Sequence, residues 1–153
     1  MKKFELTSET KINIFGKKLF RIKALISFGN VEAGETGGWV EKEENVNQSG
    51  DAWVSGNVWV SGNAWVSGDA RVSGNAEVSG NADYTTIRGF GTQFRTTTFF
   101  RCKDKQVKVS CGCFYGTIPE FREQVKNTRK GKIAEEYLMI ADLMEKHFAE
   151  EAK

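Results

Sequence analysis

Apolar and polar positions alternate along the middle of the chain with a strict period of six residues. From Gly50 the sequence reads GDAWVS, GNVWVS, GNAWVS, GDARVS, GNAEVS and GNADYT without a gap. A valine takes the fifth place of the first five hexads, and an alanine or valine lies two places before it. Fixed internal periods of this kind are typical of solenoid folds.

Each hexad is predicted to form one short strand and one turn. The valine points inward, the small residue two places earlier fits a tight corner, and Gly, Asn and Asp tolerate the left-handed backbone of the turn. Three hexads would close a coil of 18 residues, and stacked coils would pair their backbones about 4.8 Å apart. The pattern therefore predicts a short left-handed β-helix over residues 50–85.

The helix is expected to start earlier than the regular repeat. Gly38-Trp39-Val40 matches the end of a hexad, and Val46 follows six residues later. The step from Val46 to Val54 is eight residues, which indicates a two-residue insertion at one corner. We expect eight rungs, a little under three coils, with the helix spanning residues 38–85.

The flanking segments are predicted to cap the open ends of the solenoid. Residues 1–37 are expected to hold a hairpin of strands Lys11–Phe15 and Leu19–Ile26, followed by a glycine-rich turn. Residues 86–153 are expected to form a ββαα cap after a loop over 85–91. Its strands are predicted at 94–102 and 106–111, and its helices at 118–127 and 133–149.

Two signals support the predicted helices. Thr117 and Glu120 have the spacing of a capping box, with Pro119 in the first turn. An apolar stripe at helical spacing along the second helix is predicted to pack on the hairpin; its members are Ile133, Tyr137, Ile140, Ala141, Met144 and Phe148. The predicted fold class is thus mainly β: a β-helix between an N-terminal hairpin and a ββαα cap.

The Gly-Asn-Ala-x-Val repeat resembles the hexapeptide-repeat family, whose enzymes include acyltransferases and γ-class carbonic anhydrases. The resemblance implies the β-helix and often a trimer. Those enzymes depend on histidines, whereas His147 is the one histidine of this chain and lies far from the repeat. The resemblance therefore argues against these activities, and we expect no enzyme.

Three tryptophans stand just before inward valines, so strand alternation sends them outward. These are Trp53, Trp59 and Trp65, and the residue 18 places after Trp53 is Arg71, which allows a cation–π contact. Large aromatic side chains are costly when left in water. Either the flanking segments and neighbouring subunits cover them, or they form a surface for a ligand or partner.

Charge and cysteine content narrow the classes of site. Residues 50–85 carry one basic and four acidic side chains, whereas residues 86–153 carry thirteen and nine, a mild net +4. Cys111 and Cys113 lack a second pair, and adding Cys102 gives three ligands where structural zinc needs four. We expect no metal, no cofactor and reduced thiols.

No secretion signal and no apolar run of membrane-spanning length is evident, so we expect no membrane partner.

The strongest candidate for a binding surface is the predicted C-terminal hairpin. Its basic, hydroxyl and aromatic side chains suit phosphates and bases; the candidates are Arg88, Arg95, Thr97, Arg101, Lys103 and Tyr115. An ordinary solvated basic face is the alternative. A second basic cluster at a helix end (Lys126, Arg129, Lys130 and Lys132) also complements the helix dipole without any ligand.

Three stretches together resemble small uncharacterised proteins of bacteriophages and prophages. They are GGWVEKEENV (37–46), the repeat itself and TTTFFRCKDKQVKVSCGCFYGTIPEFREQV (96–125). The resemblance implies a phage-encoded protein acting in the host bacterial cytoplasm, and small accessory phage proteins often counter host defences. It implies no catalytic residues.

Two functions follow as expectations. The first is a non-enzymatic binder that counters host immunity, by sequestering a phosphate-bearing, nucleotide-type signal or by blocking a defence protein. The second is a trimeric assembly module of the phage particle. We expect a homo-oligomer in both cases, with a trimer favoured, and nucleic acid is a less favoured partner.

Overall fold

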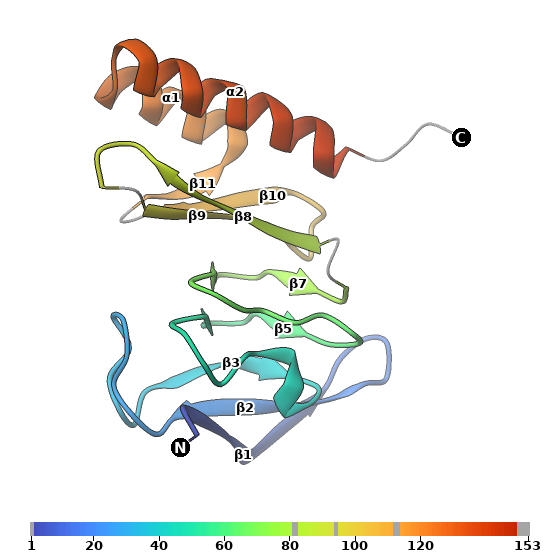
Figure 1. Cartoon of the computed structure of the whole chain (residues 1–153). Helices are drawn as coiled ribbons and strands as arrows, with labels where there is room; N and C mark the ends of the chain where they lie inside the picture. Colours follow the sequence, from blue (N-terminus) through green and yellow to red (C-terminus); the bar gives the residue numbers. More distant parts are fainter. Residues whose placement is uncertain (1, 81–82, 94, 112–113, 150–153) are drawn as a thin grey trace.

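The computed structural model describes residues 2–80, 83–93, 95–111 and 114–149 of a mainly β chain with two helices near its C-terminal end. The elements follow one another in layers (Figure 1): an N-terminal hairpin, a stack of short parallel strands, an antiparallel sheet and a helical layer. The described part of the chain contains no helix long and apolar enough to cross a membrane.

The N-terminal hairpin consists of β1 (Phe4–Ile12) and β2 (Lys18–Ala24), paired antiparallel. The hairpin is confirmed, but its predicted first strand at Lys11–Phe15 is wrong, because β1 ends at Ile12. The Asn13 side-chain oxygen accepts hydrogen bonds from the backbone N–H groups of Phe15 and Lys17, at 2.9 and 3.0 Å. This side chain bends the backbone into a turn that the apolar pattern does not reveal.

The repeat forms short parallel strands that stack in columns. One column contains β3 (Thr36–Val40), β5 (Trp59–Val60) and β7 (Glu77–Val78), and a second contains β4 (Trp53–Val54) and β6 (Arg71–Val72). A bridge between Val46 and Val66 marks a third, next to the 3-10 turn Glu43–Asn45. Partners lie 20 residues apart in the first step (Trp39 and Trp59) and 18 in the next. The predicted 18-residue spacing between stacked segments and the two-residue insertion are thus confirmed.

The side chains of the repeat divide as the six-residue pattern predicts. Its valines and corner residues are fully or almost fully buried; they are Val40, Val46, Val54, Val60, Val66, Val72, Val78, Ala52, Val58, Ala64, Ala70 and Ala76. Gly62 shows why glycine opens a hexad: its φ is +62°, and a Cβ there would lie 2.6 Å from the Ser79 carbonyl oxygen of the next coil. Residues 81–82 of the last hexad lie outside the described residues.

After the repeat comes a four-stranded antiparallel sheet of order β11-β10-β9-β8. Its strands are β8 (Tyr84–Phe90), β9 (Arg95–Arg101), β10 (Val107–Cys111) and β11 (Phe114–Thr117). The predicted hairpin of β9 and β10 is confirmed. The predicted loop over 85–91 is wrong, because β8 pairs with β9 there, so the cap is ββββαα rather than ββαα.

The two helices α1 (Ile118–Thr128) and α2 (Gly131–Phe148) cover the sheet face that lies away from the coils (Figure 1). The capping box is confirmed: the Thr117 hydroxyl accepts from the Glu120 backbone N–H at 3.2 Å, and the Glu120 carboxylate accepts from the Thr117 N–H at 2.9 Å. The whole predicted apolar stripe of α2 packs into one cluster with Phe99 and Val109 of the sheet.

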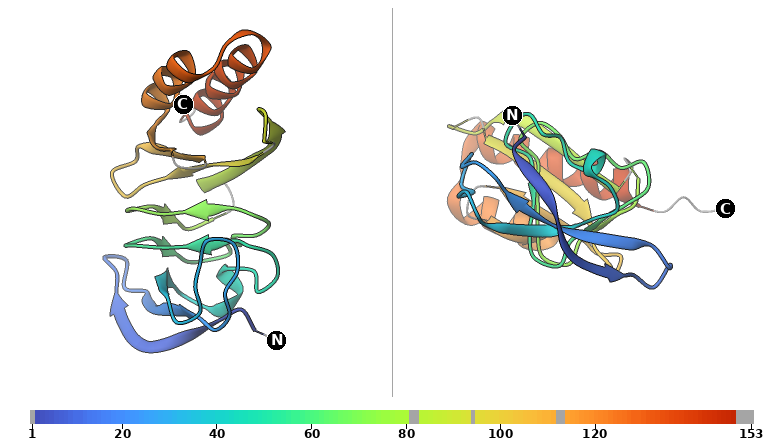
Figure 2. Two further views of the ribbon diagram at one scale, coloured as in Figure 1. Left: turned by 90° about the vertical axis from the view of Figure 1, so that its left-hand side faces the viewer. Right: turned by 90° about the horizontal axis from the view of Figure 1, so that it is seen from below.

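The flanking segments close both ends of the coil stack, as expected (Figure 2). At the N-terminal end the buried Lys3 ammonium donates to the Ala52 carbonyl oxygen at 2.7 Å. At the other end the Thr98 hydroxyl accepts from the Arg71 backbone N–H at 3.1 Å, and Phe100 joins the hydrophobic cluster of the coils. Adjacent residues of β9 therefore serve two cores, with Phe99 facing the helices and Phe100 facing the coils.

Candidate functional site

A cavity of about 300 Å³ opens between one end of the antiparallel sheet and the two helices. The ends of β8, β9, β10 and β11 contribute to it, together with one face of α1 and the first turns of α2. Its lining is an apolar wall of Phe90, Phe114, Phe121 and Val125 and a polar group of Thr92, Gln93, Arg95, Cys111, Gln124, Thr128, Arg129 and Tyr137. We refer to it as the sheet–helix pocket.

Phe121 organises the apolar wall of the sheet–helix pocket. Its ring contacts Phe114 and Tyr137, with centroids 5.7 and 5.9 Å apart, and meets Phe99 edge-on at 6.1 Å. The helical spacing of Phe121 and Val125 turns both side chains toward the sheet, where both are buried. These contacts give the pocket a rigid aromatic wall, which is the surface that a planar ring of a ligand prefers.

Two arginines lie at the polar side of the sheet–helix pocket. Arg95 begins β9, and its Nε donates to the Gln93 side-chain oxygen at 2.9 Å. Arg129 is the C-cap residue of α1, and its Nη1 donates to the Thr128 carbonyl oxygen at 3.3 Å. The charges of both guanidinium groups lower the pKa of the Tyr137 phenol, against the larger opposite effect of its burial. Guanidinium groups beside a cavity are donors of the type that suits phosphate or carboxylate oxygens, and in this structure both Nε and Nη2 of Arg95 donate to Gln93.

The Tyr137 phenol completes the polar side. Burial raises its pKa, and the nearby Cys111 raises it further, whereas Arg129 and Arg95 act in the opposite direction. The phenol therefore stays protonated at neutral pH and offers a hydrogen-bond donor. A Cβ at Gly91 would lie 2.5 Å from the Tyr137 hydroxyl oxygen, so only glycine lets the β8–β9 turn approach the phenol this closely.

Of the basic hairpin residues predicted from sequence, the structure places only Arg95 in the sheet–helix pocket. Arg101 lies six residues along β9, about 20 Å away at the usual rise of a strand, where its Nε pairs with Asp83 at 3.2 Å. Arg88 pairs with Asp69 at 3.2 Å. Tyr115 lies against Phe100 on the coil side of the sheet. The predicted residues therefore do not form one surface.

Thr97 and Trp53 are corrections to the predicted binding surface. Thr97 is buried between sheet and helices, and its hydroxyl contacts the Cys111 sulfur at 3.1 Å. Trp53 is buried beneath Phe4 and Phe28, whose ring centroids lie 6.2 and 5.3 Å from its own. Strand alternation does send Trp53 out of the coil, but the N-terminal segment covers it, so Trp53 is not part of an open outer surface.

The other repeat residues have separate surroundings. Trp59 is half-buried, with the Lys103 ammonium 3.8 Å from its ring centroid. Trp65 is exposed, and its carbonyl oxygen accepts a hydrogen bond from the Tyr84 hydroxyl. Arg71 pairs in register with Trp53 as predicted. Within the described part of the chain, however, the cations that lie over tryptophan rings are lysines and Arg21, not Arg71.

Sequence reasoning missed most of the sheet–helix pocket. From the sequence, the helix dipole accounts for Arg129 and core packing accounts for Tyr137, and each explanation holds for part of the side chain. The one sequence signal for a polar site here is the hydroxyl of Tyr137. A tyrosine on a buried apolar stripe needs a hydrogen-bond partner for that oxygen. Gln93 and Gln124 carried no signal. Cys113 of the predicted cysteine group lies outside the described residues.

Neither a candidate metal site nor a comparison with known proteins assigns a role to the sheet–helix pocket. Over residues 2–80, 83–93, 95–111 and 114–149, no group of three or more His, Cys, Asp or Glu side chains is placed to hold a metal ion. No protein-family model matches the sequence, and no curated protein is significantly similar to it. The chemistry of the sheet–helix pocket itself is what bears on function.

Proposed function

We propose that this protein is a non-enzymatic binding protein that holds a small phosphate-bearing molecule of nucleotide type in the sheet–helix pocket. The observation that carries the proposal is the placement of Arg95 and Arg129 beside one aromatic-walled cavity. The guanidinium forks suit the phosphate, and the phenylalanine wall suits a base. The volume of about 300 Å³ is at the lower end for ligand pockets and fits a mononucleotide-sized ligand.

Apart from the Cys111 thiol, the polar groups of the sheet–helix pocket favour binding over catalysis. Guanidinium groups and side-chain amides neither give up nor accept a proton near neutral pH, and the raised pKa of Tyr137 keeps its phenol protonated. Together with the resemblance to phage proteins, this supports sequestration of a nucleotide-type immune signal in the host bacterial cytoplasm. Blocking a host defence protein is the other form of the same role.

We further propose that the stacked coils are a left-handed β-helix and that the protein assembles as a trimer. The support for the helix is the parallel pairing at steps of 18 and 20 residues and the left-handed glycine at the turns. The support for the trimer is the family resemblance and the exposed indole of Trp65 on an outer face of the coil. That exposed indole also favours the second candidate function, an assembly module of the phage particle.

Calorimetric titration of the intact protein with inorganic phosphate, mononucleotides and cyclic nucleotides tests the binding proposal. We expect one nucleotide to bind and Arg95→Ala and Arg129→Ala each to weaken it by about ten- to a hundredfold, the usual value of a charge-assisted hydrogen bond. The affinity of Arg129→Lys should lie between those of the wild type and Arg129→Ala, because lysine keeps the positive charge but lacks the planar fork of donors.

Arg88→Ala is the matched control, because Arg88 is an exposed arginine of the same sheet outside the sheet–helix pocket. It should bind the nucleotide as the wild type does. The proposal is wrong if no nucleotide or phosphate binds, or if the pocket variants and the Arg88 variant bind equally well.

A further inference from the structure

The last residue of β1 and the turn after it expose three large apolar side chains within four residues. Ile12, Ile14 and Phe15, which we call the apolar tip, are 71%, 83% and 66% exposed. They make up three of the eight exposed large hydrophobic residues in the described part of the chain. Single exposed apolar residues need no explanation, but three on one short turn mark a contact surface.

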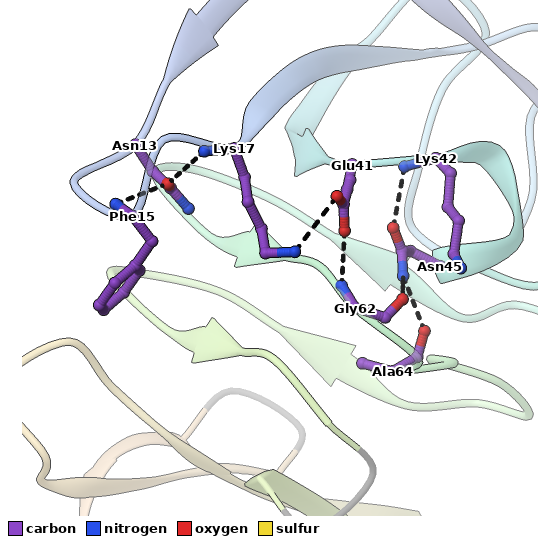
Figure 3. A network of polar contacts seen from close by, with 8 residues as sticks. All are labelled: Asn13, Phe15, Lys17, Glu41, Lys42, Asn45, Gly62 and Ala64. Atoms are coloured by element: carbon purple, nitrogen blue, oxygen red, sulfur yellow. Dashed lines mark hydrogen bonds and ion pairs between the residues drawn. The ribbon is translucent and has the colours of Figure 1, made fainter.

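The apolar tip is held in place by the polar network of Figure 3. Asn13 is buried inside the turn, where its side-chain oxygen caps the backbone N–H groups of Phe15 and Lys17. The Lys17 ammonium reaches the Glu41 carboxylate at 3.4 Å, and the other oxygen of Glu41 accepts from the Gly62 backbone N–H at 2.7 Å. The turn is thus linked to the coil by polar contacts. Because the turn is already ordered, it loses little conformational entropy when a surface buries the apolar tip.

The segment that carries the apolar tip is rich in basic residues, of which Lys17 and Arg21 are paired with Glu41 and Glu9. No acidic residue occurs between Glu9 and Glu32, a stretch that contains Lys11, Lys17, Lys18, Arg21 and Lys23. Lys18 is exposed and lies opposite Ile12 in the strand register, directly behind the tip. Lys23 is exposed farther along β2. A surface that receives the tip therefore gains by being negatively charged.

Among negatively charged surfaces, the shape of the hairpin favours a lipid surface over a protein partner. Seen from below, the hairpin extends beyond the outline of the coils (Figure 2, right). A projecting apolar turn backed by lysines needs a matching cavity in a protein partner, whereas a fluid lipid surface admits it without one. Apolar side chains then enter the acyl boundary while ammonium groups remain among the headgroups.

We propose that the apolar tip inserts into an anionic lipid surface and holds the protein at the membrane face as a peripheral protein. Ile14 and Phe15 supply the insertion, and Lys18 contributes the attraction to acidic headgroups. Such a contact requires no spanning helix, so the proposal departs from the sequence-based expectation of no membrane partner, which considered only spanning segments and secretion signals. It does not rest on the sheet–helix pocket, whose lining residues belong to the sheet and helices at the other end of the coil stack from β1 and β2 (Figure 1).

Flotation of the intact protein with lipid vesicles tests the proposal. Vesicles of phosphatidylcholine alone are compared with vesicles that also contain phosphatidylglycerol, each at low and at high salt. We expect flotation with the anionic vesicles at low salt and little with phosphatidylcholine alone. The double variant Ile14→Ser/Phe15→Ser should bind the anionic vesicles about tenfold more weakly, since it removes two of the inserting side chains. Lys18→Glu should weaken binding chiefly at low salt.

The matched control is Met139→Ser/Leu143→Ser, which removes two side chains of α2 that are 70% and 55% exposed. This control should float like the wild type, and both double variants should retain the circular dichroism spectrum of the wild type. The proposal is overturned if the wild type does not float with anionic vesicles, or if the tip and control variants float equally. It is also overturned if the tip variant alters only the mass of the assembly in light scattering, which would make the tip a contact between copies.

Discussion

Val60 lies in the middle of a column of three valines at the centre of the coil stack. It pairs in register with Val40 below and Val78 above, and all three side chains are fully buried. Val60→Ala removes two methyl groups. Their lost transfer free energy is about 1.6 kcal/mol at the usual value for a buried carbon. A cavity of roughly 50 Å³ adds about 1.2 kcal/mol.

We therefore expect Val60→Ala to lower the free energy of unfolding by about 3 kcal/mol. The adjacent Trp59 reports the transition by its fluorescence during urea unfolding, with circular dichroism as a second probe. The midpoint should fall while the urea dependence stays constant. Val107→Ala is the matched control, because Val107 is only half-buried on β10; its loss should stay below about 1.5 kcal/mol.

The reasoning rests on Val60 being enclosed by fixed coils above and below. A loss under about 1 kcal/mol with an unchanged urea dependence would show that the column relaxes into the space. A loss equal to that of Val107→Ala would show that the middle of the coil stack is no better packed than the sheet. Either result would refute the interpretation of the repeat as a closed, capped stack.

Three further predictions concern single groups. The hydrogen bond from the Gly62 N–H holds the pKa of Glu41 below its ordinary value of 4.5. The stability that ionised Glu41 gives the folded protein is therefore complete above pH 4.5 and is lost as pH falls through the lowered pKa. Acid unfolding monitored by circular dichroism should therefore be less steep for Glu41→Gln, and parallel curves would contradict this. Thr117→Ala should cost about 1 kcal/mol in urea unfolding through loss of the N-cap; an unchanged midpoint would oppose it. Burial raises the pKa of Cys102 to about 11. Iodoacetamide should therefore leave Cys102 unmodified in the folded protein but modify it in urea. Peptide mass spectrometry after cleavage before Asp104 measures this difference.

The repeat was predictable because its six-residue period specifies local structure and stacking together. Valine burial and the insertion before Val54 follow from spacing alone, since each hexad meets a copy of itself one coil later. β8 was not predictable in the same way. Thr85, Thr86 and Ile87 favour a strand, but the neighbouring glycines favour a loop, and pairing with β9 decided between them.

The sheet–helix pocket could be predicted only in part. Arg95 is predicted as one of several basic side chains of the C-terminal hairpin. Arg129 and Tyr137 are 34 and 42 residues farther along the chain and come beside it only through the packing of α1 and α2 on the sheet. Single-sequence patterns report the face on which a residue lies but not which face of another element it meets. The apolar tip was not predictable either. The composition of residues 11–15 favours a strand, but the Asn13 side chain accepts hydrogen bonds from Phe15 and Lys17 and so forms a turn there.

Native mass spectrometry of the protein purified from a host with active immune signalling tests the central claim most directly, because it reports assembly mass and retained ligand together. We predict a trimer carrying a phosphate-containing molecule of nucleotide size, which Arg95→Ala/Arg129→Ala loses while its assembly mass stays the same. A clean assembly with nothing bound in the wild type, or a ligand that survives the double substitution, would contradict the claim that the sheet–helix pocket binds a nucleotide.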